Sequence, residues 1–182
     1  MTVTVIARPD GETVSLSEAK EYLRIGHAGE DALVLELVAS AGARVEHATG
    51  RALLAQTIRI QLKAWPQALL DGKFVLTPGP AIDLLSVKLG EDDLTERFIL
   101  QNNCLALRPW NYLPIVQAGQ VITIDVRVGY GTSQDVPDDL KLAIKQLAAL
   151  AYRLRSDGDD RGISALPESV DALLQPYKGV RL

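Results

Sequence analysis

The sequence has a single cysteine, only two histidines and no long apolar run. Cys104 is the only cysteine among 182 residues, which excludes an internal disulfide and a multi-cysteine zinc site within one chain. No apolar run reaches the ~20 residues that a membrane-spanning helix requires. The first residues lack the basic start of a secretory signal. We therefore expect a soluble, intracellular globular protein.

The chain also lacks a basic excess and the common catalytic motifs. Its net charge of -4 argues against a protein that mainly grips nucleic acid electrostatically. There is no G-x-S-x-G nucleophile elbow and no G-x-x-x-x-G-K-[ST] phosphate loop. His27 and His47, the only histidines, have no spacing that pairs them. We predict that the chain is not an enzyme, that it uses no cofactor and that its role is binding or assembly.

One acidic loop, residues 157–168, has part of the spacing of a calcium-binding loop. Counting Asp157 as the first position places Asp159 at the third, Gly162 at the sixth and Glu168 at the twelfth. Arg161 occupies the fifth position, where an oxygen ligand is required. A solvated loop is the favoured interpretation, and a monomeric intracellular binding module with a weak calcium loop is kept as the alternative function.

Apolar residues recur at helical spacing towards both ends of the chain, whereas apolar and polar residues alternate in the middle, as they do in strands. Ser15 and Glu18 match a capping box at the start of a first helix that extends to about Arg24. Apolar residues three and four apart predict further helices over about 30–50, 137–155 and 167–174. Period-two alternation predicts strands over 2–7, 57–62, 74–76, 84–89, 98–100, 104–107 and 121–128.

These patterns predict an α+β fold, in which a helical bundle core carries a β-rich insertion, an antiparallel sheet or sandwich, between the second and third major helices. The expected parts are an N-terminal strand with helices, the insertion, the C-terminal helices and a C-terminal tail without periodicity. Their ranges are 1–53, 54–131, 132–175 and 176–182.

Three blocks of sequence together resemble a known family. The first block is residues 16–24 followed by 30–31; the second is Ala41, 44–46, 49–53 and 56–57; the third is 128–131, 136–137, 140–141 and 143–144. In this order and spacing they resemble the head–tail connector (adaptor) proteins of tailed phages and phage-derived gene transfer agents. The resemblance spans about residues 12 to 155, and each block consists largely of capping, packing and turn residues.

The resemblance implies a structural virion protein at the neck, the head–tail junction, assembled in the bacterial cytoplasm. Family members form a homo-oligomeric ring of about a dozen copies under the portal protein, next to a tail-side stopper (head-completion) protein. The ring extends the DNA channel without sequence-specific binding, and no membrane is involved. The acidic composition suits this role, because a strongly basic lumen would hold phosphate by counterion release.

Two sets of residues are candidates for contacts within such a ring. The charged residues in the matched blocks are expected to form intersubunit or intrahelical ion pairs: Glu18, Lys20, Arg24, Glu46 and Arg51. The tail is expected to dock on the portal through Tyr177, Lys178, Val180, Arg181 and Leu182. The tail carries apolar and basic residues but no core periodicity, which is typical of a segment that orders on a partner.

Overall fold

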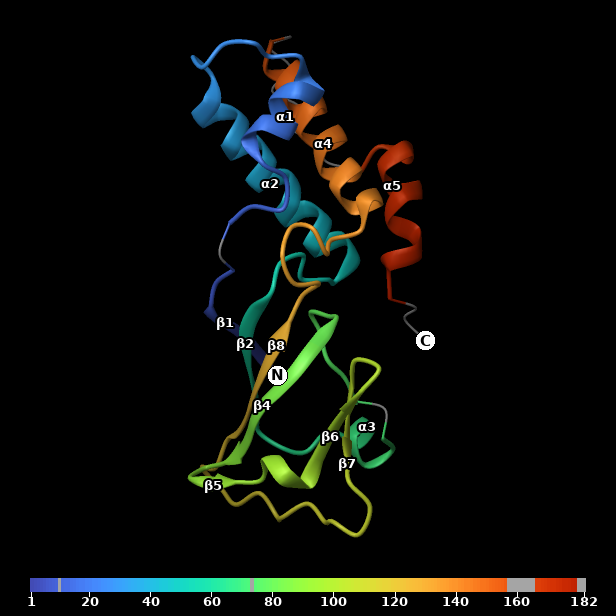
Figure 1. The fold of residues 1–182 in the computed structure, drawn as a ribbon. Coiled ribbons are helices and arrows are strands. Elements are labelled where there is room, and N and C mark those ends of the chain that lie inside the picture. The colour runs from blue at the N-terminus through green and yellow to red at the C-terminus, as the bar shows by residue number, and fades with distance from the viewer. Residues whose placement is uncertain (10, 73, 157–165, 180–182) are drawn as a thin grey trace. The chain divides into compact units, whose positions relative to one another are not determined.

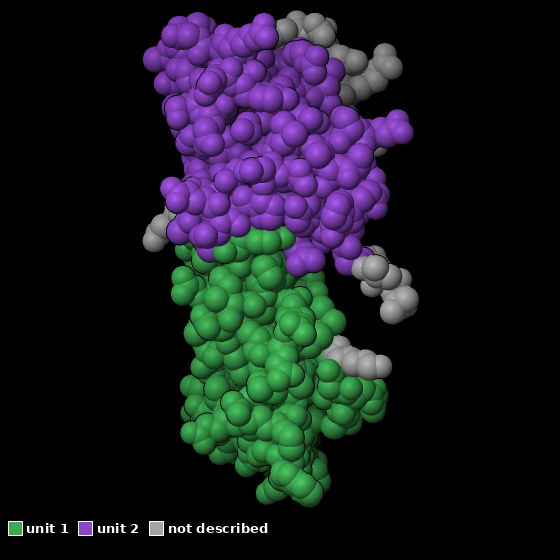
Figure 2. Space-filling view, turned by 45° about the vertical axis from the view of Figure 1, so that its right-hand side comes forward, with its two compact units in different colours: residues 1–10, 54–130 green, residues 11–53, 131–182 purple. Residues whose placement is uncertain are grey.

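The computed structural model describes residues 1–9, 11–72, 74–156 and 166–179, which form two compact units (Figure 1). The sheet unit comprises residues 1–10 and 54–130, and the helical unit comprises residues 11–53 and 131–182 (Figure 2). Helices in one unit and antiparallel sheets in the other confirm the predicted α+β fold.

The helical unit is built around two long antiparallel helices that lie side by side (Figure 1). Its elements are α1 (Leu16–Leu23), α2 (Asp31–Thr49), α4 (Asp138–Ser156), α5 (Glu168–Leu174) and the 3₁₀ turn η2 (Gln175–Tyr177). Along α2, Val34, Val38 and Val45 are buried, and Leu140 and Ile144 are buried along α4. Because these residues recur at helical spacing, each helix presents one apolar stripe to the core of this unit.

The start of α1 confirms the predicted capping box. The Ser15 Oγ accepts a hydrogen bond from the Glu18 amide at 3.3 Å, and the Ser15 amide donates to Glu18 Oε2 at 2.8 Å. The helix ends where Arg24 adopts a left-handed conformation, with φ of 59°. Local sequence therefore determines both ends of this helix.

The sheet unit contains two antiparallel sheets. The five-stranded sheet has the order β1 (Thr2–Ala7), β2 (Gln56–Leu62), β8 (Ile122–Val128), β4 (Ala81–Leu89) and β5 (Asp92–Asp93). The three-stranded sheet has the order β3 (Phe74–Val75), β7 (Cys104–Leu107) and β6 (Phe98–Gln101). This unit also contains the short helix α3 (Gln67–Leu70) and the 3₁₀ turn η1 (Thr95–Arg97).

Strict alternation of apolar and polar residues gives the central strands one apolar face and one polar face. In the register of β2 with β8, Ile60 lies opposite Ile124, and both side chains are fully buried. The next pair, Arg59 and Asp125, points to the opposite face of the sheet. Buried Phe98 of β6 and Leu105 of β7 extend the apolar core of this unit.

Two features of the sheet unit differ from the sequence prediction. We expected the strand over 2–7 to belong with the helices of residues 1–53, but β1 pairs with β2 from Thr2 to Ala7, so this strand lies in the sheet unit. The pairing partners are at least fifty residues apart, and the local alternation of apolar and polar residues does not reveal them. Helix α3 was not expected, because four residues are too few to show a helical period.

Candidate interaction surfaces

The end of α2 is joined to the C-terminal segment by one of the candidate charged residues. The Arg51 Nε donates a hydrogen bond to the backbone carbonyl of Tyr177 at 3.1 Å. The Lys178 ammonium pairs with the carboxylate of Asp171 on α5. Two residues of the expected docking tail are therefore held against the helical unit. Val180, Arg181 and Leu182 lie outside the described residues.

Lys20 forms an ion pair between helices of the same chain. Its Nζ lies 2.5 Å from Oδ1 of Asp31, which is the first residue of α2. The Asp31 carboxylate also lies near the positive end of the α2 dipole, where a negative charge is favourable. This pair therefore connects α1 to the beginning of α2.

The other candidate charged residues have different roles. Glu18 belongs to the capping box, and its pKa is lowered chiefly by the hydrogen bond from the Ser15 side chain. Glu46 accepts a hydrogen bond from the Leu53 amide at 2.8 Å, and burial raises the pKa of its carboxyl group. Arg24 is exposed, and the structure shows no ion pair for it among the described parts of the chain. Contacts of all these residues between copies stay a prediction.

A cluster that the sequence did not reveal joins the beginning of α2 to the end of α4. Oε2 of Glu30 accepts a hydrogen bond from the Tyr152 hydroxyl at 2.5 Å, and Oε1 accepts one from Arg155 Nη2 at 2.8 Å. The Arg155 guanidinium also lies over the Tyr152 ring, 5.0 Å from its centre. These hydrogen bonds, the one from Tyr152 first, lower the pKa of Glu30. More than 120 residues separate the partners, so no local pattern predicts the cluster.

A second unpredicted pair crosses two strands of the five-stranded sheet. Arg59 on β2 and Asp125 on β8 form a two-pronged contact, with Nε and Nη2 donating to the two carboxylate oxygens at 2.8 Å and 2.7 Å. The hydrogen bond from Arg59 is the main reason that the pKa of Asp125 is lowered. This pair stabilises the observed register of β2 with β8 on the polar face of the sheet.

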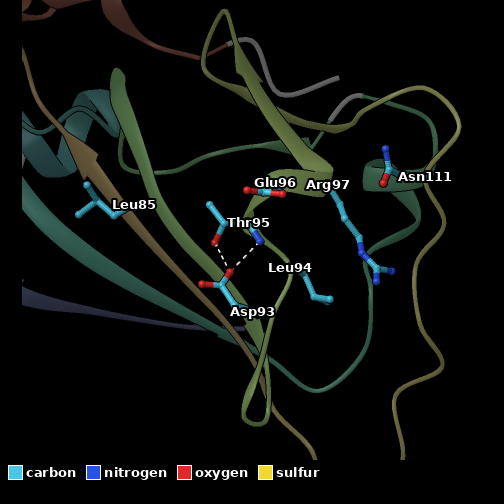
Figure 3. A pocket seen from close by; sticks show the side chains of 7 residues that line it. All are labelled: Leu85, Asp93, Leu94, Thr95, Glu96, Arg97 and Asn111. Atoms are coloured by element: carbon cyan, nitrogen blue, oxygen red, sulfur yellow. Dashed lines mark hydrogen bonds between the residues drawn. The ribbon is translucent and has the colours of Figure 1, made fainter.

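An open depression in the sheet unit is lined mainly by polar residues of β5 and η1 (Figure 3). The Asp93 carboxylate in this depression accepts hydrogen bonds from the Thr95 hydroxyl and amide, at 2.5 Å and 2.9 Å. These bonds lower the pKa of Asp93 and occupy one of its oxygens. The carboxylate therefore acts as a local turn cap, and this geometry does not support a role as a general base.

Metal and membrane sites are not seen in the part of the chain that the structure describes. Within residues 1–9, 11–72, 74–156 and 166–179, no group of three or more His, Cys, Asp or Glu side chains is placed to hold a metal ion. No helix over those same residues is both long and apolar enough to span a bilayer. Most of the calcium loop considered at 157–168 lies outside the described residues.

Among the described residues, the most exposed large apolar side chains belong to the sheet unit. Trp110, Ile115 and Tyr112 lie between β7 and β8 and are 102%, 89% and 73% exposed. Apolar residues of β1 are also exposed along this outer strand, which pairs only with β2 among the described residues. Neither surface was predicted from the sequence patterns, although the absence of charged residues from 109–121 is visible in the sequence.

The described residues thus define a two-unit α+β protein with exposed apolar side chains on β1 and on the segment between β7 and β8. No family model matches the chain, and no curated protein sequence matches it. Solved structures do match it. A chain from the structure "Virion of native gene transfer agent (GTA) particle" has a TM-score of 0.83 and 26% identity, covering 100% of this chain and 97% of that chain.

Two further matches come from the neck of such particles. A chain from "Neck of empty GTA particle computed with C6 symmetry" has a TM-score of 0.80 and 25% identity. A chain from "Neck of native GTA particle computed with C12 symmetry" has a TM-score of 0.80 and 24% identity, which is similarity of fold alone. Both matches cover 100% of this chain and 97% of the other. The structural neighbours are therefore components of virions and their necks.

Proposed function

We propose that this chain is a structural subunit of the neck of a gene transfer agent or phage particle, and that it forms a ring under the portal. The observation that carries the proposal is the similarity over the whole chain to virion and neck chains at 26% and 25% identity. The three sequence blocks that resemble connector proteins support the same role independently, because they come from the residues and not from the fold.

The proposed ring has about twelve copies and extends the DNA channel from the portal towards a tail-side stopper protein. The copy number rests on the family resemblance alone. The net charge of -4 on each copy suits passage of DNA, because identical subunits multiply the negative charge around the channel. The role is structural, and no reaction is assigned to the chain.

Assembly with a portal ring tests this proposal. The purified chain is mixed with the portal protein of the same particle, and the complex is imaged by electron microscopy. We expect an axial ring on the tail-side face of the portal. A chain that stays monomeric in the presence of the portal, with no added axial density, contradicts the proposal. Monomers without the portal do not contradict it, because the proposal concerns the ring that forms on the portal.

Docking of the C-terminal tail on the portal is a second part of the proposal. Tyr177 and Lys178 already bind within the helical unit, so deletion of residues 180–182 leaves those anchors in place. Deletion of 176–182 also removes the anchors. We expect both deletions to abolish portal binding and to preserve the helical circular dichroism signal. Unchanged portal binding by the 176–182 deletion contradicts tail docking and leaves ring formation to the imaging experiment.

A further inference from the structure

The loop between β7 and β8, residues 108–121, presents three large apolar side chains to solvent. Trp110 is 102% exposed, Ile115 is 89% exposed and Tyr112 is 73% exposed. Residues 109–121 contain no Asp, Glu, Lys or Arg, although charged residues make up 23% of the chain. Exposed Trp and Tyr without charge are typical of the centre of a protein–protein interface.

The backbone of this loop is held in place from several sides. The Trp65 Nε1 donates to the Pro114 carbonyl at 2.9 Å, and Arg97 Nη1 donates to the Tyr112 carbonyl at 3.2 Å. The Arg97 guanidinium also lies 5.2 Å from the centre of the Tyr112 ring. Trp110 adopts a φ of 65°, a left-handed conformation that is costly for a bulky residue. The loop is thus preordered with its apolar side chains outside, which lowers the entropy cost of docking.

A second charge-free surface lies on β1. Val3, Val5 and Ile6 are 40%, 45% and 46% exposed, and residues 1–7 contain no charged side chain. In the described chain β1 pairs with β2 along one edge only. An apolar outer strand of this kind usually marks a surface that another chain covers.

The two surfaces are associated with different outer strands of the five-stranded sheet. Strand β1 is first in the strand order and β5 is last, and η1, whose Arg97 holds the loop, directly follows β5. A ring of identical subunits is closed by heterologous contacts, in which two different patches of the same chain meet. The sheet unit contains two different patches whose own residues, 1–7 and 109–121, carry no charged side chain, and the Arg97 guanidinium borders the second patch over the Tyr112 ring.

We propose that the loop of one copy, through Trp110, Tyr112 and Ile115, packs on β1 of the next copy around the ring. The occupant of both surfaces is therefore a second copy of this chain. This inference rests on the proposed ring and adds which surfaces close it.

Disulfide cross-linking tests the contact in the assembled ring. In a Cys104→Ser background, Val5→Cys and Ile115→Cys are combined, and the chain is assembled on portal rings and oxidised. We expect a ladder of covalent oligomers beyond the dimer on a non-reducing gel. Each single-cysteine variant is the matched control and should give no ladder, since one cysteine per chain links at most two copies.

A substitution series tests the same contact without cross-linking. Trp110→Ser is expected to reduce the number of assembled rings at least tenfold at a fixed protomer concentration. Its unfolding midpoint should stay unchanged, because the Trp110 side chain is fully exposed. Leu70→Ser is the control, since Leu70 is 58% exposed in the same unit but lies in neither patch. We expect this variant to assemble normally.

The outcomes separate the two proposals. Rings that assemble with Trp110→Ser as with the natural chain, or a double-cysteine variant that forms rings but no ladder, overturn the proposed contact and leave the ring proposal standing. The absence of any ring with the natural chain overturns the proposed function, and the contact with it.

Discussion

The Nε atom of Arg51 lies 3.1 Å from the backbone oxygen of Tyr177 and donates a hydrogen bond to it, across 126 positions of sequence. Arg51 directly follows the Gly50 cap of α2, and Tyr177 ends η2. The contact therefore ties the C-terminal segment to the end of α2 within the helical unit. The ion pair that the sequence predicts for Arg51, between copies or within a helix, stays a prediction beside this carbonyl contact.

Replacing Arg51 should loosen the C-terminal segment. A charged donor to a partly buried carbonyl contributes more than an average hydrogen bond, so Arg51→Ala should lower the free energy of unfolding by about 1–2 kcal/mol. Hydrogen exchange of the Lys178 amide, which bonds to the Leu174 carbonyl, should become faster. Arg153→Ala, at an exposed position of α4, is the control and should change stability by less than about 0.5 kcal/mol. Equal effects of the two variants would argue against the anchor.

Neutralising Glu30 should reduce the loss of folding stability that occurs as the pH falls. The bonds from Tyr152 and Arg155 lower the pKa of Glu30, so the folded state favours its charged form. The contribution of Glu30 to folding stability is fully present at pH values above the ordinary pKa range of Glu. It is lost as the pH falls through the lowered pKa. Glu30→Gln should therefore lose less stability than the natural chain between about pH 5 and pH 3 in urea titrations. Glu36→Gln, at an exposed position of α2, is the control for the loss of one carboxylate.

Neutralising Glu46 should change the pH dependence of folding stability in the opposite direction. Burial raises the pKa of Glu46, so folding favours its protonated form, and stability falls as pH rises from the ordinary Glu range through the raised pKa. Glu46→Gln removes this penalty while its amide oxygen still accepts the Leu53 hydrogen bond. The variant should be at least as stable as the natural chain at pH 7 and gain nothing at pH 3. Denaturant unfolding at both pH values measures this, and a loss of stability confined to pH 7 would refute it.

Two glycines should respond to alanine in opposite ways. Gly129 has a φ of 117°, and a Cβ built there would lie 2.2 Å from the Leu54 carbonyl oxygen. Gly129→Ala should therefore cost about 3 kcal/mol or more, through backbone strain and steric overlap. Gly42 lies inside α2, where a Cβ would meet nothing within 4 Å. Gly42→Ala should raise the free energy of unfolding by about 0.5–1 kcal/mol. Thermal or denaturant unfolding measures the stability of the two variants. Similar changes in the free energy of unfolding would contradict the backbone conformations assigned to the two glycines.

Much of the fold could be predicted because its signals are local. The capping box at Ser15 and Glu18, the apolar stripe of α2 and the alternation over Ile122–Val128 need only neighbouring residues, and the structure confirms each of them. The pairing of β1 with β2 needs two segments separated by both α1 and α2, so the sequence pattern assigned that strand to the wrong part of the chain.

The candidate surfaces were harder to predict than the fold. Among the five charged residues of the matched blocks, Lys20 forms an ion pair with Asp31 in the described chain. Glu18 belongs to the capping box, Glu46 accepts from the Leu53 amide and Arg51 donates to the Tyr177 carbonyl. The cluster around Glu30 and the Arg59–Asp125 pair were missed, because their partners come from distant helices or strands. Exposure of Trp110 is likewise a property of the folded loop, although its charge-free surroundings are visible in the sequence.

The sequence by itself determined the acidic composition, the helical ends, the β-rich middle and the resemblance to neck connectors, because these depend on local periodicity and on residues in order. Only the tertiary structure decided which charges meet, where β1 pairs and which apolar side chains stay outside. Those outcomes depend on contacts between residues far apart in the chain, where packing and hydrogen-bond geometry select one partner among many of the same chemical type.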